Sequence, residues 1–494
     1  MKKKPSATQQ MDLFGAMPVV SPPPPSAPRV VVPPVVVEEE VPGELAIDLA
    51  VRLERNVAVL AGAGAGKTYS LVTMCLHLLG GARSAGAIEC AKLGLLTFTE
   101  KAADEMRARL RQRLDVLADG KGDEPALRAS FEAQGVEFPK ASKWRAIRDE
   151  LGAATIGTFH SLCVQLLRRA PPGGAVSPHF ELLDERSANA LLRDLVERTL
   201  LERVERGGGF RELVAEIGFT RLVDGVVPVA ARLREEGVAA ELVRVPDGAA
   251  LRQQFDEALD ALKSQTRQTQ PKPGTKQQAA LQAFSLTLAR VTFENFEARL
   301  PELRAAMVGA RAPLDVLREA VAAKNDDPNN ISQLYSASLL APYEAQLREV
   351  LVDVLKAHAD ALTTRGVLDF TGLLVKARDL LRDDLEARRA AQARFGALLV
   401  DEFQDTNRLQ LEIVLLLSED AGANVSTAFE GRHEEIVALH QRPGFLAVVG
   451  DRKQSIYEFR GADVSVFEVM ARAIERNGGA RAYLRNSRRS TPAL

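Results

Sequence analysis

The sequence has few cysteines and lacks any long apolar segment. Its three cysteines are Cys75, Cys90 and Cys163, and no two of them form a C-x-x-C pair. This odd, widely spaced set fits a reducing compartment better than a disulfide framework, and it offers no ligand pattern for zinc or an iron–sulfur cluster. The basic start of the chain is not followed by an apolar core region. We therefore expect a cytoplasmic protein that does not enter a membrane.

The sequence also lacks an excess of either charge. The formal net charge is -2, with 26% charged and 46% hydrophobic residues in a chain of 494. A chain of this length and composition should fold into several domains. This balance of positive and negative charges excludes binding to nucleic acid through a global basic field. Any surface that binds nucleic acid must therefore be a local patch.

Residues 1–43 are rich in proline and valine. Prolines at this density prevent both helix and central strand, so we expect a disordered tail. Within the tail, Gln10, Leu13 and Phe14 belong to a peptide with two adjacent apolar anchors that could dock into a partner's groove. This peptide resembles the one by which bacterial replication and repair proteins bind the DNA sliding clamp. The alternative is a chance match, because so short a pattern is degenerate.

A glycine-rich stretch lies between the apolar run 57–60 and a helical pattern. In this order, backbone N–H groups and a helix N-terminus converge on a triphosphate. Lys67 would reach the β- and γ-phosphates, and Thr68 would offer its hydroxyl to Mg²⁺. The alternative is an Ala- and Gly-rich turn without a ligand, which the flanking strand and helix disfavour. The predicted nucleotide-binding residues are Ala61, Gly62, Ala63, Gly64, Ala65, Gly66, Lys67 and Thr68.

Two further predicted strands end in polar or aromatic residues. The strand at 92–99 ends in Thr97, Phe98 and Thr99, and a strand near 155 leads into a helix that starts around His160. Repeated strand-helix units predict a doubly wound parallel sheet, whose ligands meet the carboxyl ends of the strands. Alone, these residues would more commonly be a core phenylalanine between threonines and a helix-capping histidine.

The chain from about 177 to 362 has helical patterning and no strand signature, and the polar stretch 263–274 predicts a flexible loop within it. After it, the apolar strand 397–400 ends in Asp401 and Glu402. One carboxylate could bind Mg²⁺ and the next could position or deprotonate water. The pattern is weak alone, and the glycine-rich stretch upstream makes it strong.

A last predicted strand, 445–449, precedes an aromatic and basic segment. Tyr457 and Phe459 beside Arg460 offer two flat faces and a cation, which suit base stacking and phosphate contact with single-stranded nucleic acid. A strand-to-helix turn could instead bury the same aromatics.

Six stretches together resemble the UvrD/Rep group of superfamily 1 DNA helicases, and within it the RecB/AddA-like branch. They are AGAGAGKT from Ala61, TFTEKAADEM from Thr97, TFHS from Thr158, LDFTGLL from Leu368, DEFQDT from Asp401 and VGDRKQSIYEFRGAD from Val449. The resemblance spans nearly the whole chain after the tail, and its last two stretches are highly specific.

The resemblance implies ATP and Mg²⁺ as cofactors, with Asp401 on Mg²⁺ and Glu402 as the catalytic base. It implies that Gln404 and Gln454 sense the γ-phosphate. If the end of the chain is aligned on its last Arg-Ser, Arg489 would contact the γ-phosphate, and Arg488 is the other candidate. The residues that match DNA contacts are Thr97, Phe98, Thr99, His160, Tyr457, Phe459 and Arg460.

The sequence departs from the family at several positions. The adenine-reading Gln has no counterpart ahead of Ala61, Arg452 replaces a proline, and Glu100 replaces the asparagine after Thr-Phe-Thr. The family's later motifs also have no counterpart, so we expect a truncated motor with weak ATP hydrolysis of its own.

The expected fold is α/β: a P-loop RecA-like parallel sheet with a large inserted all-helical domain. The expected domains are the tail at 1–43, a RecA-like ATP-binding domain at 44–176 and 366–480, the helical insertion at 177–365, and the start of a second RecA-like domain at 481–494. The expected function is the motor of a 3′–5′ helicase that translocates on single-stranded DNA in repair and recombination. The alternative is a non-motor ATP- and DNA-binding adaptor tethered to the sliding clamp. Candidate partners are single-stranded DNA, duplex junctions, the clamp, and a nuclease or second helicase subunit.

Overall fold

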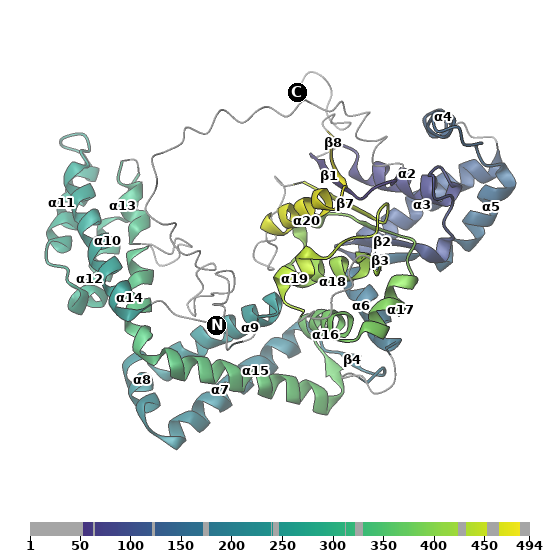
Figure 1. Ribbon diagram of the computed structural model, residues 1–494. Coiled ribbons are helices and arrows are strands. Elements are labelled where there is room, and N and C mark those ends of the chain that lie inside the picture. Colours follow the sequence, from purple (N-terminus) through teal and green to yellow (C-terminus); the bar gives the residue numbers. More distant parts are fainter. Residues whose placement is uncertain are drawn as a thin grey trace, which may run out of the picture. The chain divides into compact units, whose positions relative to one another are not determined.

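The computed structural model describes two compact units of the chain, which are considered separately (Figure 1). One contains Asn189–Leu233 and Val238–Asp360; the other contains the described residues up to Ala188 and from Ala361 onward, together with Arg234–Gly237. The described residues are 53–62, 65–120, 124–170, 177–238, 240, 247–311, 313–321, 330–422, 431–451 and 464–484. The tail, with Gln10, Leu13 and Phe14, lies outside them. Among these residues, no helix has both the length and the apolarity that crossing a membrane requires.

The larger unit contains a six-stranded sheet in which every pairing is parallel. The strand order is β3-β2-β6-β7-β1-β8, so strands from distant parts of the sequence lie side by side (Figure 1). The prediction of an α/β fold with a parallel sheet is confirmed. The strands are β1 Val57–Ala61, β2 Leu93–Thr97, β3 Thr155–Thr158, β6 Ala397–Val400, β7 Leu446–Gly450 and β8 Ala480–Leu484.

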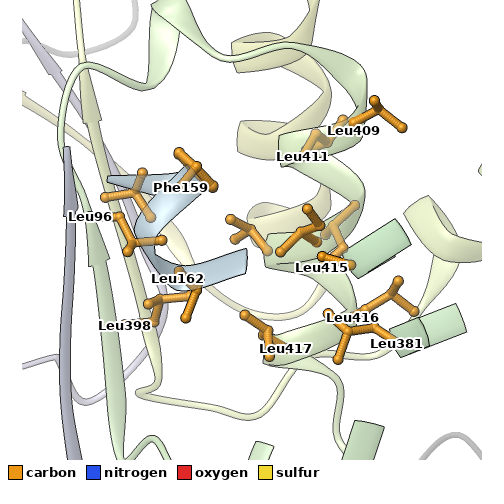
Figure 2. Close-up of a cluster of buried hydrophobic side chains, with 14 of the residues drawn as sticks. Leu96, Phe159, Leu162, Leu381, Leu398, Leu409, Leu411, Leu415, Leu416 and Leu417 are labelled. Carbon is orange, nitrogen blue, oxygen red and sulfur yellow. The ribbon is translucent and has the colours of Figure 1, made fainter. Parts of the chain in front are cut away.

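Alternate residues of β1, β2, β6 and β7 belong to two separate hydrophobic clusters, because side chains in a strand alternate between its two faces. In β1, Val57 and Val59 belong to one cluster and Ala58 to the other. Figure 2 shows part of the second cluster, in which Leu96 and Leu398 of the strands meet Phe159 and leucines of α18. The first cluster includes residues of α2 (Lys67–Gly80), α3 (Glu100–Asp119), α4 (Pro125–Glu132) and α5 (Ala141–Glu150); the second includes residues of α6 (Phe159–Arg168), α16 (Phe370–Asp383), α17 (Leu385–Ala393), α18 (Arg408–Ser418), α19 (His433–Ala438) and α20 (Val464–Arg476).

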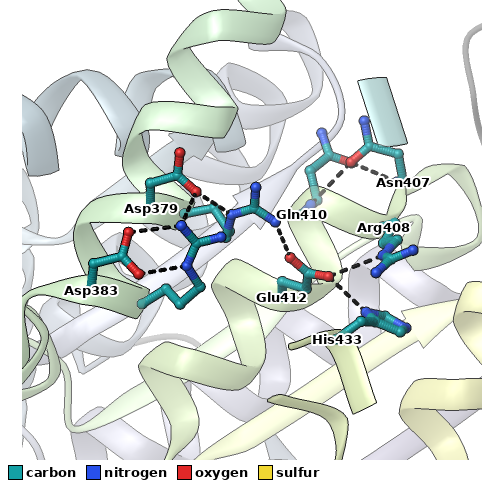
Figure 3. Close-up of polar contacts among 9 residues, drawn as sticks. Asp379, Asp383, Asn407, Arg408, Gln410, Glu412 and His433 are labelled. Carbon is teal, nitrogen blue, oxygen red and sulfur yellow. Dashed lines mark hydrogen bonds and ion pairs between the residues drawn. The ribbon is translucent and has the colours of Figure 1, made fainter. Parts of the chain in front are cut away.

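A network of buried charges links α16, α18 and α19 on this second face. The Glu412 side chain is 1% exposed, and it accepts hydrogen bonds from Arg378, Arg408 and His433. Figure 3 shows Glu412 with Arg408 and His433 on adjoining segments. Burying a carboxylate is costly unless cations and hydrogen bonds compensate it, and this network supplies both.

The smaller unit is built around two helical cores. One core is formed by parts of α7 (Glu185–Arg206), α8 (Gly209–Ile217), α9 (Phe219–Glu236) and α15 (Glu344–Arg365). The other is formed by α10 (Gly248–Gln268), α11 (Lys276–Leu288), α12 (Phe296–Ala306), α13 (Asp315–Ala320) and α14 (Ile331–Leu340). The rings of Phe255, Phe293, Phe296 and Tyr335 pack together in this second core. Apart from the one at 480, the domain boundaries drawn from the sequence stay a prediction.

Three details differ from the expectations. Residues 177–365 include a strand, β4 (Glu181–Leu182), which pairs with β5 (Val367–Leu368) and is too short to show an alternating pattern. The stretch 263–268 is helical, because α10 continues through it with Leu262 and Thr266 buried. Residues 481–484 belong to β8 of the first sheet rather than to a second domain, because they pair with β1. Residues 485–494 lie outside the described part of the chain.

Candidate active site

The glycine-rich loop connects the carboxyl end of β1 to the N-terminus of α2. Gly66 precedes α2 with φ 93° and ψ 30°, a left-handed conformation that a residue with a Cβ adopts only at a cost. The Ala65 amide donates to the Gly62 carbonyl oxygen over 3.1 Å and closes the turn. The helix α2 therefore begins close to the carboxyl end of β1. A helix N-terminus in this position can bind a phosphate through its free backbone N–H groups. Ala63 and Gly64 lie outside the described residues.

Lys67, the first residue of α2, contacts Glu402 although 335 residues separate them in the sequence. Its Nζ lies 2.5 Å from Glu402 Oε2, and the two side chains are 11% and 34% exposed. The register of the sheet explains this meeting, because β7 pairs with both β1 and β6. The two parts of the predicted ATP site are thus brought together.

Asp401 follows β6 and is 6% exposed. Its amide donates to the Leu96 carbonyl oxygen over 2.8 Å, and its Oδ1 accepts from the Glu402 amide over 3.0 Å. Burial and the neighbouring Glu402 raise the pKa of Asp401 to about 7, although the Glu402 amide and Lys67 act in the opposite direction. Such a carboxylate is poorly compensated by the protein alone, and a bound cation would stabilise its charged form.

Glu402 has a left-handed backbone, with φ 49° and ψ 44°. A residue with a side chain pays about 1–3 kcal/mol for such a conformation, which persists only where the surroundings impose it. Gln404 is one of the residues that surround Glu402. Its Nε2 donates to Glu402 Oε2 over 2.8 Å, and its Oε1 accepts from the Asp451 amide over 2.8 Å. Gln404 thus joins Glu402 to the end of β7. Gln454, the other predicted sensor, lies outside the described residues.

Asp405 is a buried carboxylate to which the sequence alone assigns no role. It is 8% exposed, and its Oδ1 has no hydrogen-bond partner among the described residues. Burial and Glu402 raise the pKa of Asp405 to about 6, while Lys67 and Gln404 act against this. The signal available in the sequence is a third acidic residue within five positions of a strand end.

These residues fit ATP and Mg²⁺. The part of the chain that the structure describes contains no group of three or more His, Cys, Asp or Glu side chains that could hold a metal alone. Mg²⁺ does not require one, since it commonly takes one or two protein oxygens and completes its shell with phosphate and water. Asp401 and Thr68 could supply the protein oxygens, and the loop, α2 and Lys67 could hold the phosphates.

Thr97, Phe98 and Thr99 lie at the same edge of the sheet, where Thr97 is the last residue of β2. Thr97 is buried and its hydroxyl donates to the Thr99 carbonyl oxygen over 2.9 Å. The Thr99 side chain caps α3 by accepting from the Ala102 amide over 3.1 Å. Both hydroxyls thus have local structural contacts, whereas Phe98 is half-buried. Their contact with DNA stays a prediction.

His160 lies in the first turn of α6, beside an aromatic residue that the sequence alone does not assign to the site. The ring of Phe370 meets the His160 ring edge to face, with centroids 5.2 Å apart at 86°, and Phe370 is 46% exposed. Burial lowers the pKa of His160, and Glu100 partly opposes this. The sequence marks the stretch that contains Phe370, but it gives no role to the aromatic ring.

The remaining predicted site residues lie outside the described part of the chain. They are Tyr457, Phe459 and Arg460 of the aromatic segment, and Arg489 near the end. The aromatic segment follows Asp451, whose amide donates a hydrogen bond to Gln404 Oε1.

A parallel sheet that brings a glycine-rich loop, a lysine and an Asp-Glu strand end together defines a P-loop nucleotide-binding protein. The family model described as the UvrD/REP helicase N-terminal domain matches residues 46–475. The chain belongs to this family.

The chain is also similar to bacterial proteins whose names describe them as one subunit of an ATP-dependent helicase/nuclease. It is 26% identical over 471 residues to the protein of Lactiplantibacillus plantarum, in a match that covers 83% of this chain and 35% of the relative. It is 27% identical over 507 residues to that of Desulforudis audaxviator, covering 87% and 37%. The chain therefore spans about a third of the length of these relatives.

Proposed function

We propose that this chain is the ATP-hydrolysing motor portion of a DNA helicase that translocates 3′ to 5′ on single-stranded DNA in repair and recombination. The observation that carries the proposal is the 2.5 Å contact between Lys67 and Glu402, because it joins the phosphate-binding loop to the strand end that would activate water. Membership of the helicase family and the names of the relatives support the reaction class.

Each residue of the site would have one task. ATP supplies the phosphoryl group when bound, and Mg²⁺ neutralises charge on its oxygens. Lys67 would bind the β- and γ-phosphates and thereby leave Glu402, whose carboxylate could then accept a proton from water. Asp401 and Thr68 would hold Mg²⁺, and Gln404 would keep Glu402 oriented through its 2.8 Å hydrogen bond.

Gln454 would report the state of the γ-phosphate, and Arg489 would contact it. Charge stabilisation by an arginine is worth about 10³–10⁵ in the rate of phosphoryl transfer. The cation that the described structure places beside Glu402 is Lys67. We also propose that the chain by itself binds ATP well and hydrolyses it slowly.

The DNA strand would lie along the carboxyl edge of the sheet. Phe98 and His160 follow adjacent strands there, and Phe370 adds a partly exposed ring beside His160. Tyr457, Phe459 and Arg460 would continue this surface. Stacking contributes about 1–3 kcal/mol per base, so a few such rings suffice to hold a strand without reading its sequence.

The proposed partners extend beyond DNA. The names of the relatives suggest that a second polypeptide completes the helicase/nuclease. The peptide around Gln10, Leu13 and Phe14 suggests the sliding clamp. All of these interactions would take place in the cytoplasm.

ATP hydrolysis by the 494-residue chain, with and without oligo-dT, tests the motor function. We expect DNA to stimulate hydrolysis, and Lys67→Ala to lower it about 100-fold, the effect typical of losing one charge-stabilising group. Lys276→Ala, an exposed lysine of the helical unit, is the matched control and should leave the rate unchanged. ATP binding by the wild type without any turnover would contradict the motor and favour the non-motor adaptor.

A further inference from the structure

An acidic side chain is held in place within the edge that would receive DNA. Glu100 is the first residue of α3 and follows Thr97, Phe98 and Thr99 directly. It is exposed, and its Oε1 accepts a hydrogen bond of 2.7 Å from the hydroxyl of Thr158. Thr158 is the last residue of β3 and pairs in register with Thr97 of β2. The carboxylate thus bridges two neighbouring strand ends.

The hydrogen bonds of Thr158 determine where this carboxylate lies. The Thr158 hydroxyl oxygen accepts from the Ser161 amide over 3.2 Å, which caps α6. A hydroxyl has one proton to donate, and here that proton goes to Glu100. Burial lowers the pKa of His160, and the Glu100 charge partly opposes this lowering, so the charge acts on the imidazole. The negative charge is therefore held at the end of β3, close enough to His160 to act on its imidazole.

We propose that Glu100 sets how the edge binds single-stranded DNA, by repelling phosphates and leaving base stacking as the main source of affinity. This inference rests on the proposed function, in which the edge binds DNA. Contacts with phosphate dominate the salt-dependent part of DNA affinity, whereas stacking on aromatic rings involves no net charge. A carboxylate held at this edge lowers the contribution of phosphate contacts and leaves the contribution of stacking unchanged. A strand held in this way could move past the rings with little electrostatic resistance.

The test is Glu100→Gln in the full 494-residue chain, with fluorescently labelled oligo-dT as the probe and affinity measured by anisotropy. Glutamine keeps an oxygen that can accept from Thr158 and removes only the charge. We expect the variant to bind about fivefold more tightly at about 0.05 M salt, because one like charge within about 8 Å of a phosphate is removed. The difference should disappear at about 0.5 M salt, where screening is strong.

Two controls separate position from net charge. Asp115→Asn makes the same change of charge on α3, about 15 residues and about 22 Å along the helix, which is beyond the screening length of about 10 Å at about 0.1 M salt. It should bind like the wild type. Glu100→Asp keeps the charge and should also bind like the wild type, which a purely steric role of Glu100 would not predict.

The outcomes distinguish this inference from the function on which it rests. If the wild type binds oligo-dT and Glu100→Gln binds equally or more weakly, the inference is overturned and the proposed function stands. If Asp115→Asn tightens binding as much as Glu100→Gln, the inference is likewise overturned, because only net charge would matter. If neither the wild type nor Glu100→Gln binds oligo-dT, the proposed DNA contact fails, and the inference fails with it.

Discussion

Replacing Glu412 by glutamine tests whether the buried charge network stabilises the sheet unit. Glu412 Oε2 lies 2.5 Å from Arg378, and its Oε1 lies 3.1 Å from Arg408 and 2.7 Å from His433 Nδ1. Glutamine has nearly the same size but no charge, and its amide group would place hydrogen-bond donors against a guanidinium. The variant leaves Arg378, which is 7% exposed, as a buried cation without Glu412 as its counter-charge.

Two independent estimates give the magnitude. Breaking a buried ion pair by removing one partner costs about 3–5 kcal/mol. Burial by itself raises the pKa of Glu412, but the hydrogen bond from His433 and the charges of Arg378 and Arg408 outweigh it and lower the pKa from 4.5 to about 2. A difference of about 2.5 in pKa corresponds to about 3 kcal/mol of stability near neutral pH. We therefore expect Glu412→Gln to lower the free energy of unfolding by about 3 kcal/mol.

The single tryptophan of the chain provides the assay. Trp144 is 1% exposed and belongs to the hydrophobic cluster on the other face of the same sheet, so its fluorescence reports unfolding of this unit in urea. Glu386→Gln on α17 is the control, because Glu386 is exposed, and it should change stability by less than about 0.5 kcal/mol. A loss below about 1 kcal/mol in Glu412→Gln would refute the reasoning.

The pH dependence checks the cause. The pKa of Glu412 is lower in the folded than in the unfolded chain, so its contribution is complete above about pH 4.5 and is lost as the pH falls toward 2. The gap in stability between the wild type and Glu412→Gln should therefore be full near neutral pH and should narrow below about pH 4.5. A gap that stays constant down to about pH 3 would show that the lost stability does not come from the charge.

Three further predictions concern function. Gln404→Ala should lower ATP hydrolysis at least about tenfold with little change in ATP affinity, because it removes the hydrogen bond that orients Glu402; unchanged turnover would contradict this role. Phe370→Ala should weaken binding to oligo-dT about 5- to 150-fold, the equivalent of one stacked base, while Phe370→Tyr keeps the ring and should retain affinity; equal binding by both variants would remove Phe370 from the interface. Leu13→Ala combined with Phe14→Ala should abolish co-elution with a purified sliding clamp, and unchanged co-elution would exclude this peptide as the contact.

The sheet could be predicted from the sequence because most of its strands carry a local signal. The apolar runs of β1, β2, β6 and β7 are bounded by turn or polar residues, and the glycine-rich loop marks where the nucleotide site begins. The strand β4 could not be predicted, because two residues show no periodicity. The helical course of 263–268 could not be predicted either, because its polar side chains resemble a loop and the burial of Thr266 depends on tertiary packing.

Local sequence patterns could not reveal which contacts position the side chains of the candidate site. Lys67 and Glu402 each carry a recognisable signal, but the left-handed backbone of Glu402 and its hydrogen bond from Gln404 depend on β6 and β7 lying side by side. The same limit applies to Phe370, because its role depends on α16 starting next to His160. The types of residue in the site are thus predictable, whereas their partners require the folded sheet.

Buried charges show this limit most clearly. Arginine and glutamate at helical spacing predict a solvated face, yet the side chains of Arg378 and Glu412 are only 7% and 1% exposed. Glu412 lies one turn into the helix that follows the predicted catalytic Glu402, and Arg378 lies on the helix that begins at Phe370. Replacing a buried ion pair by a well-packed hydrophobic pair of similar volume is often neutral for stability, whereas removing one partner alone leaves a buried charge uncompensated. The charges join α18, the helix that follows Glu402, to α16, the helix that begins at Phe370, and this arrangement exists only in the folded chain.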